Sequence, residues 1–125
     1  MAACRVTKLL SLYEDATTKF DASQIQWREP WQIIPPDYAS KVEDELYRDM
    51  NAGHVLSGRL FAAIGRRKDC DDILFYLGDR PPRFAVVHLT FQREKRAEWP
   101  KTSMFDSLAA LMEQRILPEA ENYAV

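Results

Sequence analysis

Two short segments with an alternating apolar pattern, residues 72–77 and 83–92, constrain the fold of this chain more than any other feature. They are rich in Val, Ile, Leu, Phe and Tyr, and the turn-forming residues 78–82 (Gly-Asp-Arg-Pro-Pro) separate them. A period of two is typical of a β-strand, and a five-residue connection joins antiparallel neighbours. The pattern therefore predicts a β-hairpin in which the numbers of opposing residues sum to about 160.

A third apolar segment, residues 55–66, precedes this hairpin after a turn-like stretch, so we expect an antiparallel meander of three or four strands. Residues 37–51 have helical spacing after two prolines, and Gly53 is expected to end this helix with left-handed backbone. Residues 103–116 form a second helical pattern, which Pro118 is expected to close. The predicted fold class is α+β, with both helices on one face of the sheet.

The chain has the length of a single domain spanning residues 1–125. We expect residues 1–36 to form an amphipathic helix followed by an ordered strap rich in Trp and Pro. Residues 37–117 are expected to form the helix–meander–helix body, and residues 118–125 a loose tail.

Charge and composition exclude several classes of protein. The net charge of −2 provides no overall basic field, so we expect neither a nucleic-acid nor a membrane partner. The two cysteines lack metal or redox spacing, which favours reduced thiols and a cytoplasmic location. The chain contains no phosphate-binding glycine loop and no zinc ligand set, and we expect no cofactor and no bound metal.

The hairpin register separates two apolar sets of side chains. Odd-numbered positions from Ile73 to Leu77 and from Ala85 to Phe91 form a wholly apolar face, which is the expected core. The even-numbered face is mixed, because Leu74, Phe84 and Val86 accompany polar residues. An exposed apolar patch of this kind requires a cover. The candidates are the N-terminal helix, the strap, a second copy of the chain or a partner.

The same register places Asp72 opposite His88, with Tyr76 two residues along on the same face. A carboxylate that orients an imidazole is the arrangement that a general base needs, so these three residues are the catalytic candidates. The alternative, which we favour, is that Asp72 satisfies a half-buried histidine in a sheet.

Basic and aromatic residues supply the candidates for binding. Arg66, Arg67 and Lys68 follow one strand, and Arg93 follows another, at the same expected edge of the sheet. They either form a cationic rim for an anion or acidic partner, or they are a solvated turn, which we favour. Trp27 and Trp31 of the strap and Trp99 complete the set of candidate binding residues.

Residues 71–75 (DDILF) and 85–91 (AVVHLTF), followed by Glu98-Trp99-Pro100 and Phe105-Asp106-Ser107, carry a resemblance to known proteins. Over residues 54–117 the chain resembles a family of small uncharacterised bacterial proteins with the pattern DDVLF, VVHLTW and WP. Phe91 stands where that pattern has Trp. The resemblance implies a bacterial cytosolic protein and no particular activity.

We therefore expect a non-enzymatic interaction or regulatory module that binds a protein partner, or a second copy of itself, through the even-numbered sheet face. The alternative is a small enzyme or ligand-binding protein with a pocket around Asp72, Tyr76 and His88 under the strap.

Overall fold

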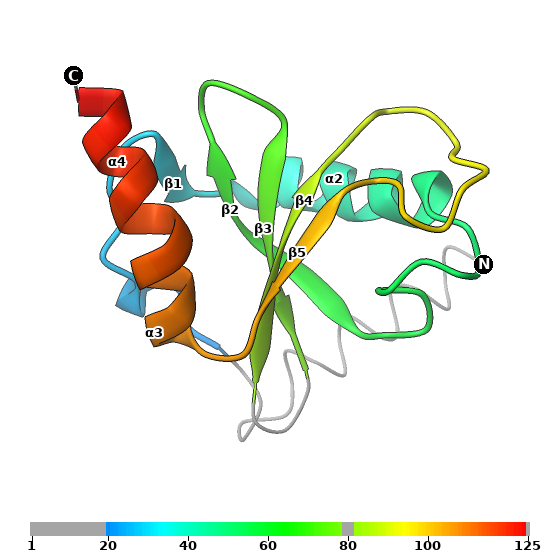
Figure 1. The fold of residues 1–125 in the computed structure, drawn as a ribbon, viewed down its shortest axis with the longest axis horizontal. Coiled ribbons are helices and arrows are strands. Elements are labelled where there is room, and N and C mark those ends of the chain that lie inside the picture. The colour runs from blue at the N-terminus through cyan, green and yellow to red at the C-terminus, as the bar shows by residue number, and fades with distance from the viewer. Residues whose placement is uncertain (1–19, 79–81, 125) are drawn as a thin grey trace.

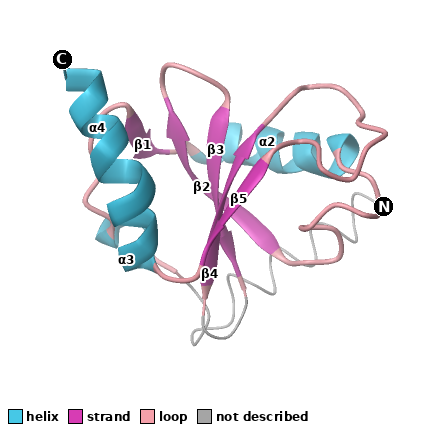
Figure 2. Cartoon of the chain, in the orientation of Figure 1, coloured by secondary structure: helices cyan, strands magenta, loops and turns pink. Residues whose placement is uncertain are grey.

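The computed structural model describes residues 20–78 and 82–124, which form a five-stranded antiparallel sheet with helices on both faces (Figures 1 and 2). The strands, neighbours in chain order, are β1 (Trp31–Ile33), β2 (Phe61–Arg67), β3 (Asp72–Leu77), β4 (Arg83–His88) and β5 (Thr102–Phe105). The α+β class is confirmed, but the expected three or four strands are too few. The amphipathic helix expected at the start of residues 1–36 lies outside the described residues, which begin at Phe20.

The predicted hairpin is confirmed in its register. β3 pairs with β4 from Asp72 opposite His88 to Leu77 opposite Arg83, so every pair of numbers sums to 160. β4 ends at His88, however, and the expected strand to residue 92 is too long. Phe91 consequently does not join the core. Its φ is 57° and its side chain is 51% exposed.

β2 begins at Phe61, six residues later than expected, because residues 54–60 form turns around a buried histidine. His54 Nδ1 accepts a hydrogen bond from the Leu56 amide, and Nε2 lies 2.9 Å from the Pro100 carbonyl oxygen. A bulge between Ala63 and Gly65 then interrupts the pairing of β2 with β3. Glu43 Oε2 accepts the Ala63 amide there at 2.8 Å, which satisfies the backbone where the ladder is irregular.

Helix α2 (Pro36–Asp49) confirms the first predicted helix and ends two residues earlier than expected. The proline start is present, and the Asp37 carboxylate accepts the Tyr38 amide at 3.0 Å. The expected left-handed stop at Gly53 is wrong. The backbone turns extended at Met50 instead, and among the described glycines Gly58 has the positive φ, 81°.

The second predicted helix is displaced. Residues 102–105 form the edge strand β5, and the helix starts only after Ser107, whose hydroxyl accepts the Ala110 amide. It runs through α3 (Leu108–Leu111), the π-helical turn η2 (Met112–Ile116) and α4 (Leu117–Ala124). Pro118 does not close it, because the helix continues from the π-helical turn through Pro118, the second residue of α4. The expected loose tail is therefore helical up to Ala124.

The two faces of the sheet have separate cores. The odd-numbered face (including Ile73, Phe75, Ala85 and Val87) packs against Val42 and Leu46 of α2. The even-numbered face (including Leu74, Tyr76, Phe84 and Val86) packs against Leu111 and Ile116 of the C-terminal helix. The two helices thus lie on opposite faces, which corrects the expectation that they share one. The even-numbered face is therefore covered by the chain itself, and each buried Leu or Ile of the cover stabilises the fold by about 1.5–3 kcal/mol.

The strap adds to the same cover. It holds the short 3₁₀ turn η1 (Ala22–Gln24) and supplies β1, and its Ile25 and Trp31 are buried in the even-numbered core. Trp27 lies directly on Gly65, where a Cβ atom would come within 2.4 Å of the indole ring. Among residues 20–78 and 82–124, no helix combines the length and apolar character needed to cross a bilayer.

Candidate functional site

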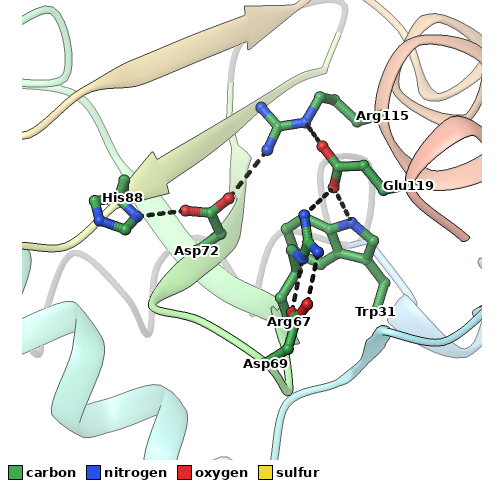
Figure 3. A network of polar contacts seen from close by, with 7 residues as sticks. All are labelled: Trp31, Arg67, Asp69, Asp72, His88, Arg115 and Glu119. Carbon is green, nitrogen blue, oxygen red and sulfur yellow. Dashed lines mark hydrogen bonds and ion pairs between the residues drawn. The ribbon is translucent and has the colours of Figure 1, made fainter. Parts of the chain in front are cut away.

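A network of polar contacts crosses the end of the sheet at the β2–β3 connection (Figure 3). We call it the Asp72 network. Its members are Trp31, Arg67, Asp69, Asp72, His88, Arg115 and Glu119. The first five lie at the ends of β1, β2, β3 and β4 or in the connection between β2 and β3, and the last two lie on η2 and α4.

Asp72 is the centre of this network. Its Oδ1 lies 2.7 Å from His88 Nδ1, and its Oδ2 accepts a hydrogen bond from Arg115 Nη2 at 3.1 Å. The Asp72 side chain is 14% exposed and the His88 side chain is 52% exposed. The sequence-based pairing of Asp72 with His88 is therefore present, and an arginine that it missed holds the other carboxylate oxygen.

Glu119 joins the C-terminal helix to the other end of the network. Its Oε2 pairs with Arg115 Nε at 2.5 Å, four residues earlier in the helix. Its Oε1 accepts a hydrogen bond from Trp31 Nε1 at 2.8 Å and lies 3.1 Å from Arg67 Nη1. Because these contacts link β1, β2 and α4, Glu119 fastens the helix to the sheet.

The geometry of Asp72 and His88 would allow His88 to transfer a proton, but it fits better with a structural role for Asp72. His88 can exchange a proton at Nε2, since Nδ1 faces Asp72 and the ring is exposed. Tyr76, the third catalytic candidate, is only 3% exposed, and its ring stacks on Phe20 at 5.1 Å. It belongs to the core and does not join the pair. The hydrogen bond from Arg115 to Asp72 connects the C-terminal helix to the sheet.

Substitution His88→Ala is expected to lower the free energy of unfolding by less than about 1 kcal/mol, because a contact between a carboxylate and a half-exposed imidazole contributes little. Urea denaturation followed by circular dichroism measures this effect. A loss above about 2 kcal/mol would show that the imidazole is a structural centre rather than an outer member of the network.

The basic candidates are largely paired with acids. Arg67 makes two hydrogen bonds to the Asp69 carboxylate, at 2.9 and 2.7 Å, in addition to its contact with Glu119. Lys68 Nζ lies 2.6 Å from Glu29 Oε1. These pairs compensate the positive charge at the β2–β3 connection, so the structure offers little support for a continuous cationic rim.

The remaining binding candidates are dispersed. The Arg66 guanidinium lies over the Tyr38 ring, 4.8 Å from its centroid. Trp27 and Trp31 pack in the even-numbered core, while Trp99 is half-buried with Lys101 Nζ 5.2 Å from its ring. Arg67 and Arg93 line separate surface depressions. The depression at Arg67 includes Asp69 and Glu119 of the Asp72 network, whereas the depression at Arg93 lies beside α2, on the odd-numbered face of the sheet.

We call the depression at Arg93 the Phe91 groove. It has a volume of about 550 Å³ and lies between the end of α2 and the chain that follows β4. Its lining residues are Glu45, Tyr47, Arg48, Asp49, Met50, Phe91, Gln92 and Arg93. Sequence reasoning missed the groove, because it placed Phe91 inside the core.

Asp49 is the unusual residue of this groove, since it is a carboxyl group with only 1% of its surface exposed. Oδ2 accepts the Phe91 amide at 3.1 Å, while Oδ1 is buried without a donor among the described residues. Burial, followed by the hydrogen bond and charge of Glu45, raises the pKa of Asp49 to about 7. The hydrogen bonds from Asp49 and Arg48 lower the pKa of Glu45. These opposite shifts fit a proton that stays on Asp49 and is donated to Glu45.

Other chemistry finds little support in the described part of the chain. No group of three or more His, Cys, Asp or Glu side chains there is arranged to hold a metal ion. Cys70 is a free cysteine at the surface. Desolvation of its thiol, together with the negative charge of Asp72, raises the pKa of Cys70, which disfavours the nucleophilic thiolate.

Comparison of the chain with protein-family models, with curated proteins and with solved structures finds no match.

Proposed function

We propose that this protein is a non-enzymatic interaction or regulatory module that binds a protein partner through the Phe91 groove. The observation that carries the proposal is the exposed Phe91 ring. It is held on left-handed backbone, which costs a non-glycine residue about 1–2 kcal/mol. A strained residue that presents an aromatic ring to solvent is an expected feature of a binding surface.

The composition of the groove supports the same proposal. Five of its eight lining residues belong to the types enriched at protein–protein interfaces: Tyr47, Arg48, Met50, Phe91 and Arg93. The packing of the sheet supports the groove, rather than a sheet face, as the binding surface. Because helices of this chain cover both faces, neither face needs a partner to bury apolar surface.

The partner that fits this surface is a protein segment with an apolar side chain to pack on Phe91 and a carboxylate to reach Arg93. A second copy of the chain is the other occupant to consider, and light scattering at micromolar concentrations distinguishes it from a different protein. The free thiol of Cys70 fits a reducing compartment, and we propose that the interaction takes place in the cytoplasm.

The test is substitution Phe91→Ser, with Val55→Ser as the matched control, because both side chains are about half exposed and only Phe91 lines the groove. The immobilised protein is used to capture partners from lysate of its source cells. We expect a specific partner to be retained by the wild type and by Val55→Ser, and to be lost by about tenfold or more with Phe91→Ser. Equal capture by all three proteins would contradict the proposal.

A further inference from the structure

The chain that carries Phe91 is fastened to the end of α2 by three hydrogen bonds. The Phe91 amide donates to Asp49 Oδ2 at 3.1 Å, and the Glu94 amide donates to the Asp49 carbonyl oxygen at 2.8 Å. Asn51 Nδ2 donates to the Lys95 carbonyl oxygen at 2.7 Å. We call residues 91–95 the Phe91 segment. Two of these three hydrogen bonds are accepted by Asp49, one by its side chain and one by its backbone carbonyl oxygen.

Both oxygens of the Asp49 carboxyl group have hydrogen-bond partners only when the group carries a proton. Oδ1 is buried, and no donor among the described residues reaches it. Glu45 stands one turn earlier on α2, and a proton on Oδ1 would be donated to its carboxylate. Without the proton, Oδ1 is an unpaired buried charge beside a second carboxylate, and both conditions are costly. The Phe91 amide and the charge of Arg48 act in the opposite direction and favour the ionised carboxylate, but burial and Glu45 outweigh them.

The other charged groups at this site do not remove that cost. Arg48 on α2 donates to Glu45 Oε1 at 2.6 Å, and its side chain is 68% exposed. From the Phe91 segment, Arg93 lines the groove, and Glu94 contributes its backbone amide. Arg48 therefore compensates Glu45, and the Glu94 carboxylate accepts a hydrogen bond from Gln92 Nε2.

We propose that Asp49 is a protonation-dependent latch, which holds the Phe91 segment against α2 when its carboxyl is protonated and releases the segment when it ionises. This inference rests on the proposed function: if the partner binds in the Phe91 groove, the groove is complete only while the Phe91 segment is held against α2. Partner binding then weakens as the pH rises. The raised pKa of Asp49, about 7, places this change near neutral pH.

Amide hydrogen exchange of the whole protein tests the latch without a partner. The amides of Phe91 and Glu94 are followed at about pH 6 and about pH 8, with correction for the intrinsic exchange rates. We expect their protection to fall by about tenfold or more in the wild type and to stay constant in Asp49→Asn. In Asp49→Asn, the amide can donate to Glu45 and its oxygen can accept the Phe91 amide. Asp37→Asn, at the other end of α2, is the matched control and should behave as the wild type.

Constant protection in the wild type, or an equal fall in Asp49→Asn, would overturn the latch. Glu45→Gln provides a second measurement if Asp49→Asn does not fold. Without the Glu45 charge, the fall in protection should move to lower pH, and an unmoved fall would count against the proposal. The experiments test the latch and the proposed function independently. A working latch with unchanged capture by Phe91→Ser would refute the proposed function alone, whereas loss of capture without a latch would refute only this inference.

Discussion

Substitution Trp31→Ala is expected to lower the free energy of unfolding by about 3–5 kcal/mol, the range for truncating a fully buried Trp. The Trp31 side chain is 1% exposed in the even-numbered core. Its Nε1 also donates to Glu119 Oε1, so truncation removes a hydrogen bond from the contact that fastens α4 to the sheet. Urea denaturation followed by far-ultraviolet circular dichroism measures the loss.

Two other variants separate the contributions. Trp31→Phe keeps most of the buried ring and loses the donor, and we expect a loss of about 1–2 kcal/mol. Trp99→Ala removes a tryptophan of the loop before β5, which is only half-buried, and should cost about 1 kcal/mol or less. If Trp31→Ala and Trp99→Ala were equally mild, β1 would be a detachable strap rather than part of the sheet.

The central hairpin could be predicted from the sequence because both of its determinants are local. Alternation assigns each residue of 72–77 and 83–88 to a face, and the length of the turn fixes the register between the strands. The pairing of Asp72 with His88 follows directly from that register. The start of α2 was likewise predictable, since Pro35 and Pro36 precede a clear helical spacing.

The two edge strands could not be predicted in the same way. β1 has three residues and β5 has four, which is too short for alternation to be distinguished from a loop or the start of a helix. Their place in the sheet depends on pairing with distant segments, Trp31 opposite Arg67 and Phe105 opposite Phe84. The helix expected from residue 103 begins later, because the serine that caps it is Ser107.

The polar sites were only partly within reach of sequence reasoning. Arg115 contacts an aspartate 43 positions away, and nothing local to either residue signals that contact. Pro118 led to the prediction of a loose tail that contains Glu119, whereas the helix continues through both residues. For Asp49 a signal did exist. It lies three residues after Leu46 and seven after Val42, on the buried stripe of α2, where a carboxyl needs an explanation.

The ionisation of Asp49 also has a consequence for the stability of the whole fold. Its pKa is about 7 in the folded protein against an ordinary 3.8, so the folded state holds the proton more tightly than the unfolded state. The stabilisation is complete below about pH 4 and is lost as the pH rises to about 7, and three pKa units correspond to at most about 4 kcal/mol. Other acids respond in the opposite sense: Arg67, for example, lowers the pKa of Asp69. The contribution of Asp49 is therefore isolated by comparison with a variant.

Asp49→Asn is expected to match the wild type at about pH 5 and to be more stable by about 2–4 kcal/mol at about pH 8, because the asparagine keeps the hydrogen bonds and never acquires the buried charge. Urea denaturation at both pH values gives the two differences, and Asp37→Asn provides the control with no pH-dependent gain. A variant that is less stable than the wild type at both pH values would mean that Asp49 is ionised in the native protein and that its charge is compensated. A stabilising substitution in a buried position is uncommon. Its occurrence here would mark Asp49 as a residue that costs the fold stability at neutral pH in return for the controlled attachment of Phe91.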